Sequence, residues 1–219
     1  MADSLPLQIQ AYNYLKEKIL SDQLEPHTLY SETKIAKEIG ISRTPVRDAI
    51  RSLSQAGYVE VVPSKGFMIR HLGEYELQES IQVRCAIEGF CIHVIAKEAD
   101  SEKGKKLLLE LENLIQKQED ALKKNDQKAF MEYDHEFHLL FIHYVNNQEF
   151  NQLFQKLMHL IHLTTQKSLS FKGRIEETLK EHRGILTALK NLDEAVAYSA
   201  LIEHLIMPLK MPIVVKEEK

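Results

Sequence analysis

Hydrophobic positions in the first part of the chain recur with a helical period. Apolar residues at helical spacing from Ile9 to Leu20 predict one amphipathic helix, which the break at Pro26 separates from the next segment. The segment SETKIAKEIG predicts a second helix, with Ser31 as its N-terminal cap and Gly40 at its end. Two helices therefore precede residue 41.

Residues 44–72 add a third helix and then change to a strand pattern. TPVRDAIRSLSQAG predicts a helix with Pro45 in its first turn and Gly57 at its end. YVEVVPSKGFMIRHL then carries β-branched and aromatic residues on both sides of a Pro-Ser-Lys-Gly turn, which indicates a two-stranded hairpin. Three helices closed by a hairpin predict a winged helix-turn-helix, whose third helix enters the major groove of DNA.

From Glu74 onward the hydrophobic period is helical and strand signals vanish. We therefore expect a mainly α fold in which residues 1–72 form the winged helix-turn-helix domain and residues 73–219 form an all-α six-helix domain. The final VVKEEK is expected to be a frayed tail. The six helices are expected at roughly residues 74–99, 102–124, 126–145, 148–170, 174–190 and 193–209.

Composition and charge narrow the class of protein. No run of about 18 apolar residues and no basic-then-apolar leader is present, so we expect a cytoplasmic protein without a membrane partner. Cys85 and Cys91 form no CxxC pair and are expected to be reduced. The net charge is -4, but residues 31–70 hold seven Lys/Arg against four acids, a local charge of +3. This local excess favours a nucleic-acid surface.

The stretch ISRTPVRDAIRSLSQAGYVEVVPSKGF carries the chemistry of DNA recognition. Arg43 and Arg47 lie one turn apart on the third helix, opposite an apolar stripe, and arginine can donate two hydrogen bonds to guanine. Ser42 and Thr44 suit phosphate contacts. At the hairpin tip a phosphate contact and a simple turn are equally good interpretations. The candidate DNA-binding residues are Ser42, Arg43, Thr44, Arg47, Lys65 and Gly66.

Four residues of the second domain could form a metal site. Asp134 and His138 are i and i+4 and project from one face of a helix, and His182 and His204 lie near the apolar stripes of two later helices. One carboxylate and three imidazoles suit Zn²⁺ or another borderline divalent ion. Taken singly, each histidine is more often a hydrogen-bonded core residue than a ligand, and the spacing alone is weak evidence.

Residues 7–70, with Ser-Arg-Thr-Pro-Val-Arg at positions 42–47, resemble the DNA-binding domain of the GntR family of bacterial regulators. The segment EPHTLY departs from the family's usual Pro-Gly at His27, and Thr33 stands where some members have a DNA-contacting arginine. The resemblance implies double-stranded operator DNA as the partner. One recognition helix reads only a few base pairs, so we expect a homodimer on an inverted repeat.

Residues 74–209 resemble the FCD ligand-binding domain of the FadR subfamily, in its six-helix VanR-type branch. That resemblance implies a metal held by an Asp-x3-His pair and two later histidines, here Asp134, His138, His182 and His204. Zinc is the expected ion, with nickel and manganese as alternatives. The resemblance also implies that Arg84 reaches toward the metal and clamps a carboxylate effector; an ion pair with Glu88 is the equal and compatible alternative.

The expected function is therefore a DNA-binding transcriptional regulator, a repressor whose operator binding is modulated by a small carboxylate at the metal site. No enzymatic activity is expected. The alternative is a metal-dependent hydrolase fused to a DNA-binding module, which requires a general base beside the metal. No motif places such a base, and Glu181 is the open candidate for it.

Overall fold

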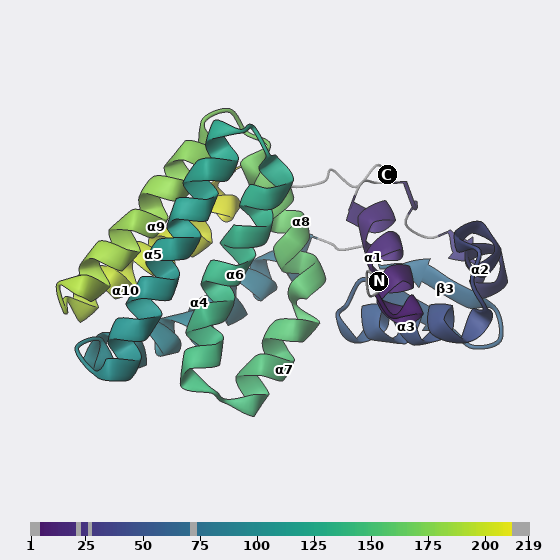
Figure 1. Ribbon diagram of the computed structural model, residues 1–219, viewed down its shortest axis with the longest axis horizontal. Helices are drawn as coiled ribbons and strands as arrows, with labels where there is room; N and C mark the ends of the chain where they lie inside the picture. Colours follow the sequence, from purple (N-terminus) through teal and green to yellow (C-terminus); the bar gives the residue numbers. More distant parts are fainter. Residues whose placement is uncertain (1–4, 21–22, 26–27, 71–73, 212–219) are drawn as a thin grey trace. The chain divides into compact units, whose positions relative to one another are not determined.

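The computed structural model describes residues 5–20, 23–25, 28–70 and 74–211. Contacts divide the chain into two compact units, Met1–Gly73 with Gln155–Leu163, and Glu74–Phe154 with Thr164–Lys219. The expected boundary at residues 72 and 73 lies outside the described residues, as do Pro26, His27 and the VVKEEK tail. The expected mainly α fold, with its strands confined to the N-terminal part, is confirmed (Figure 1).

The N-terminal unit contains the three predicted helices and a small antiparallel sheet in the order β1-β3-β2. β2 and β3 are the predicted hairpin, with Val59 opposite Ile69 and Val62 opposite Gly66. β1 has only two residues and was not expected from the sequence. The elements are α1 (Leu7–Leu20), β1 (Leu29–Tyr30), α2 (Glu32–Ile39), α3 (Arg43–Gln55), β2 (Val59–Val62) and β3 (Gly66–Ile69).

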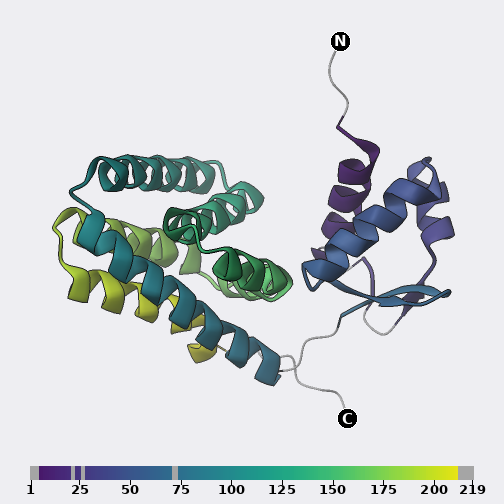
Figure 2. The ribbon, with the colours of Figure 1, turned by 90° about the horizontal axis from the view of Figure 1, so that it is seen from below.

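Packing of α1 against α3 fixes which face of α3 is left for DNA. The buried face of α3 comprises Val46, Ala49, Ile50 and Leu53, spaced at three and four residues. Figure 2 shows α1 crossing α3, with the paired strands running beside them. Arg43 and Arg47 lie on the other face of α3, away from this apolar stripe. The packing therefore leaves both side chains exposed.

Of the two end features predicted for α2, the structure has the one at Gly40 but not the side-chain cap at Ser31. Gly40 ends the helix in the left-handed region, at φ +77°, and its N–H donates to the Ala36 carbonyl. Ser31 occupies the N-cap position in extended backbone, but its side chain makes no capping hydrogen bond. Its backbone carbonyl instead accepts from the N–H of Ile35 at 3.1 Å. The expectation of a Ser31 side-chain cap is therefore wrong.

Gly66 at the start of β3 tolerates no side chain. Its φ is +139°, and a Cβ atom there would lie 2.0 Å from the Tyr30 carbonyl oxygen. Gly66→Ala is expected to lower the free energy of unfolding of this domain by more than about 3 kcal/mol, because backbone strain and a clash with backbone combine. Gly40→Ala, with φ +77° and no atom within 4 Å of the added Cβ, should lose only about 1–2 kcal/mol. Urea unfolding of the two variants measures the difference; equal losses would contradict the clash.

From Glu74 onward the described chain is helical. The segment expected as one helix over 148–170 is divided at Leu157, where the sequence has neither Gly nor Pro and nothing explains the interruption. The elements are α4 (Glu74–Glu98), α5 (Glu102–Lys123), α6 (Gln127–Val145), α7 (Gln148–Lys156), α8 (Met158–Leu169), α9 (Arg174–Lys190), α10 (Glu194–Ile206) and the 3-10 turn η1 (Met207–Lys210).

The helices of the second unit pack as a bundle. α5 contacts α6 and α9, α10 contacts α9 and α4, and α4 contacts α6, so these helices lie around a common core (Figure 1). Within α4, Cys91 is buried and both cysteines are free thiols. No helix among the described residues is long and apolar enough to cross a membrane. The bundle therefore brings residues from several helices to one interior point.

Candidate nucleic-acid interface and metal centre

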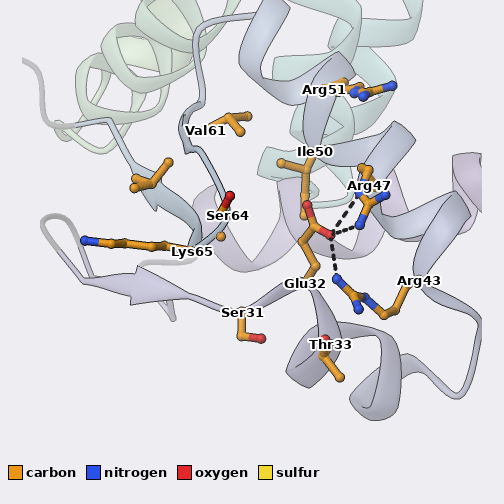
Figure 3. A pocket seen from close by; sticks show the side chains of 12 residues that line it. Ser31, Glu32, Thr33, Arg43, Arg47, Ile50, Arg51, Val61, Ser64 and Lys65 are labelled. Carbon is orange, nitrogen blue, oxygen red and sulfur yellow. Dashed lines mark hydrogen bonds and ion pairs between the residues drawn. The ribbon is translucent and has the colours of Figure 1, made fainter.

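A groove of about 480 Å³ opens on the N-terminal unit between the start of α2, the outer face of α3 and the hairpin (Figure 3). Arg43, Arg47 and Arg51 line it from α3, and Lys65 and Gly66 line it from the hairpin tip. The groove thus gathers four cationic side chains on one concave surface, as binding to a phosphate backbone requires.

The recognition residues lie at the start of α3, as the sequence predicts. Ser42 is the extended N-cap residue, and Arg43 and Thr44 form the first turn. The Arg43 and Arg47 side chains are 57% and 47% exposed, so both can reach a ligand. Ser42 and Thr44 are exposed beside the groove rather than in its lining. This arrangement suits helix insertion into a major groove, N-terminal end first.

The second unit brings the four predicted metal ligands together in its interior. Asp134 and His138 come from α6, His182 from α9 and His204 from α10. One ligand atom from each lies within 4.8 Å of the other three, and all four residues are buried. Nε2 of His204 lies 3.1 Å from Nε2 of His138 and 3.4 Å from Nε2 of His182.

Each histidine is oriented by a partner at its other ring nitrogen. Nδ1 of His138 lies 2.5 Å from Glu88 Oε2, and Nδ1 of His204 lies 2.7 Å from Glu181 Oε2. Nδ1 of His182 lies 2.9 Å from the Gln118 side-chain oxygen. An oxygen acceptor at Nδ1 assigns the proton to that nitrogen and leaves a lone pair on Nε2. When all three rings are neutral, three lone pairs point at one another, which is unfavourable unless a cation lies between them.

Burial keeps two of the histidines in the protonation state that a metal needs. Burial holds the pKa of His138 and His182 well below the ordinary value, with nearby Arg84 and His204 acting in the same direction. The imidazoles of His138 and His182 are therefore neutral. Burial also raises the pKa of Asp134 to about 6, against the lowering effect of His204 and Arg84. A cation beside Asp134 would favour its charged form.

The spacing of the donors fits a divalent ion. Zinc bonds of about 2.0–2.1 Å to nitrogen in a tetrahedral site place two nitrogens about 3.4 Å apart. The observed separations of 3.1 and 3.4 Å between Nε2 atoms match this value. Asp134 adds one oxygen, with Oδ1 3.6 Å from Nε2 of His182. A donor set of one oxygen and three nitrogens thus fits a borderline metal ion.

A small cavity of about 30 Å³ adjoins the cluster, lined by Asp134, His138 and His204 and by two arginines. Arg84 donates from Nε to Glu88 Oε1 at 2.7 Å, so the ion pair considered from the sequence is present. Its Nη2 is buried, and no described residue accepts a hydrogen bond from it. Arg174 holds both oxygens of Glu181 at 2.6 Å. Arg84 therefore keeps one donor available beside the cluster.

Two protein-family models match the chain over these two regions. The model of the bacterial regulatory proteins of the gntR family matches residues 7–69, and the model of the FCD domain matches residues 79–206, more than half of the chain. The protein is a GntR-family regulator with an FCD domain.

Curated relatives and solved structures agree with the family. The HTH-type transcriptional regulator YdhC of Bacillus subtilis is 28% identical over 91% of this chain and 88% of its own. The HTH-type transcriptional repressor RspR of Escherichia coli is 25% identical over 91% of this chain and 86% of its own. The structure of Escherichia coli McbR/YncC covers 94% of this chain and 97% of its own at 22% identity, with a TM-score of 0.72, which supports the fold.

The GntR regulator is thus a DNA-binding transcriptional regulator and not an enzyme, and the alternative of a metal-dependent hydrolase finds no support in these matches. The structure also argues against Glu181 as the general base that a hydrolase would need. Burial raises its pKa, but hydrogen bonds from His204 and Arg174 outweigh burial and lower it to about 2. Glu181 already accepts hydrogen bonds from two side chains. A carboxylate with so low a pKa is a poor general base near neutral pH.

Sequence reasoning missed the residues that orient the three histidines. Glu88, Gln118 and Glu181 lie between 23 and 64 positions from the histidine that each orients. Only Arg84 and Glu88, four apart on α4, and the neighbours Glu181 and His182 offered a local signal. The remainder required the packing of helices that are distant in sequence.

Proposed function

We propose that residues 1–72 and 73–219 are the two functional domains of a cytoplasmic repressor whose operator binding responds to a small carboxylate. The carboxylate would bind a divalent metal held by Asp134, His138, His182 and His204. The observation that carries this proposal is the convergence of three imidazoles and one carboxylate beside a cavity. A cluster of this kind without an ion would be strongly unfavourable in a buried site.

Zinc is the ion we propose, since three imidazoles with one carboxylate form a borderline set of donors. When bound, the metal would supply a positive charge that attracts an anionic oxygen. The residues that orient the histidines at Nδ1 support the same role, because such partners fix the ring and its tautomer.

The chain's own residues would select the carboxylate. Arg84 keeps Nη2 as an unused donor, so a carboxylate oxygen entering the cavity gains a charge-assisted hydrogen bond. Hydroxyl groups of Thr164, Thr165 and Ser168 line the same cavity and can bind hydroxyl or carbonyl groups of the effector. The cavity is small, about 30 Å³, which favours a small acid.

Effector binding would act by favouring one arrangement of the domains over another. A ligand with equal affinity for both arrangements shifts nothing, so its contacts with the metal and Arg84 must differ between the two. By linkage, the effector should weaken operator binding by the same factor by which operator DNA weakens effector binding.

Two-fold symmetry is the third part of the proposal. Candidate readers Arg43 and Arg47 span only a few base pairs, so a homodimer on an inverted repeat would double the discrimination. DNase footprinting on a duplex selected from random DNA should show two half-sites of opposite orientation. Protection of a single asymmetric site by a monomer would contradict it, with size-exclusion light scattering as the independent measure of mass.

A further inference from the structure

The DNA-binding groove contains an acid at its centre. Among the residues that line it, Glu32 is the one acidic residue, beside four cationic ones. Its side chain is 16% exposed, far less than those of the arginines around it. A carboxylate that faces DNA phosphates repels them, so this position lowers affinity for any duplex unless the acid has another role.

Glu32 makes its contacts with the two candidate base-reading arginines. Oε2 of Glu32 lies 3.1 Å from Nε and 3.0 Å from Nη2 of Arg47, and 3.5 Å from Nη2 of Arg43 (Figure 3). The acid is the first residue of α2 and the arginines belong to α3, so the contact joins the two helices of the helix-turn-helix. One carboxylate oxygen thus orients both side chains.

The remaining hydrogen-bond donors of Arg47 match the needs of base reading. A guanidinium has five N–H groups, and Glu32 takes those on one edge, at Nε and Nη2. Both N–H groups on Nη1 and the second on Nη2 stay available as a fork. That fork is the group that donates two parallel hydrogen bonds to O6 and N7 of guanine.

We propose that Glu32 is a positioning residue that gives this regulator sequence specificity. This inference rests on the proposed role of Arg43 and Arg47 as base readers. Glu32 restricts the rotamers of both arginines before DNA arrives, so operator binding loses less side-chain freedom. It also opposes non-operator binding, because swinging either arginine toward a phosphate breaks the ion pair and leaves the acid facing the backbone.

The test compares Glu32→Ala and Glu32→Gln with Glu38→Gln. Glu38 lies on the same helix and pairs with Lys18 at 2.5 Å and Tyr14 at 2.7 Å, so its variant loses the same charge and a similar ion pair outside the groove. The probes are a duplex selected from random DNA by the wild type and a shuffled duplex of equal composition, in the same salt.

Glu32→Ala is expected to bind the shuffled duplex about two- to fivefold more tightly and the selected duplex more weakly, so that the affinity ratio falls about tenfold. Glu32→Gln keeps the shape but not the charge and should fall between. Glu38→Gln should leave the ratio within about twofold of the wild type. Thermal unfolding checks that each variant is folded.

A Glu32→Ala variant with the wild-type ratio of affinities for the two duplexes would overturn the inference. Equal weakening on both duplexes is one such result and would indicate a purely structural role. Arg47→Ala in the same assay separates the two proposals. If Arg47→Ala lowers the ratio and Glu32→Ala does not, base reading stands and the positioning role fails. If Arg47→Ala leaves the ratio unchanged, the proposed base reading itself fails.

Discussion

Replacing His182 with alanine is expected to reduce the metal content from about one divalent ion per chain to near zero. Losing a partner outside the coordination shell typically weakens metal binding about 10- to 100-fold, and losing a ligand itself should weaken it more. Inductively coupled plasma mass spectrometry on protein purified without chelators measures the content directly.

Two variants bracket that result. His143→Ala on the same bundle removes an exposed histidine of α6 and should keep the ion. Gln118→Ala removes the oxygen that accepts from His182 Nδ1 and should retain the ion with weaker affinity. Full occupancy in His182→Ala would place the ion at another site, and no ion in the wild type would show that the four residues are a polar cluster of the core.

Stability should fall with the metal. The His182 ring is fully buried and stacks on Phe137 with 4.2 Å between ring centroids, so its removal also leaves a cavity worth about 2–4 kcal/mol. Adding a chelator to the wild type separates the two causes, because it removes the ion and leaves the ring in place. We expect the chelator alone to lower the melting temperature.

Removing Arg43 should change which DNA sequence is bound. Arg43→Ala is expected to weaken binding to a selected duplex by about 1–3 kcal/mol and to relax specificity at one base pair, as the loss of a bidentate contact to guanine does. Selection from random DNA, repeated with the variant, measures this position by position.

Lys65→Ala is the matched comparison at the hairpin tip. Lys65 lines the same groove and extends away from α3 (Figure 3), so its loss removes a charge without removing a base contact. Binding should weaken equally on all sequences, and the dependence of log affinity on log salt should fall by about one unit. Altered base preference in Lys65→Ala, with none in Arg43→Ala, would reverse the assignment.

Local patterns were sufficient for most of the fold. Gly40 and Gly57 both adopt positive φ at the helix ends where the sequence predicted them. β1 was not predicted because a strand of two residues shows no periodicity. It forms through its pairing with β3. The division at Leu157 was not predicted either, since no Gly or Pro marks it.

For the candidate metal site, the sequence predicted the four ligands but not the residues that orient them. Asp134 and His138 are linked by helical spacing, and His182 and His204 lie near the apolar stripes of later helices; the resemblance to the FCD domain strengthened the set of four. Arg174 lies seven residues before Glu181 on α9 and reaches the cluster through Glu181, which orients His204 on α10. In the groove, Glu32 and Arg47 are fifteen residues apart on different helices, so their pairing follows from the helix crossing alone.

The most direct test of the account is operator release in wild type and His182→Ala. Each protein, saturated with selected duplex, is titrated with a panel of two- to six-carbon carboxylic and hydroxycarboxylic acids and with the matching amides. We predict that at least one acid weakens wild-type operator binding about tenfold or more, that its amide does not, and that the variant binds DNA but ignores the acid. Equal release of both proteins by the same acid would contradict a sensor built on this metal site.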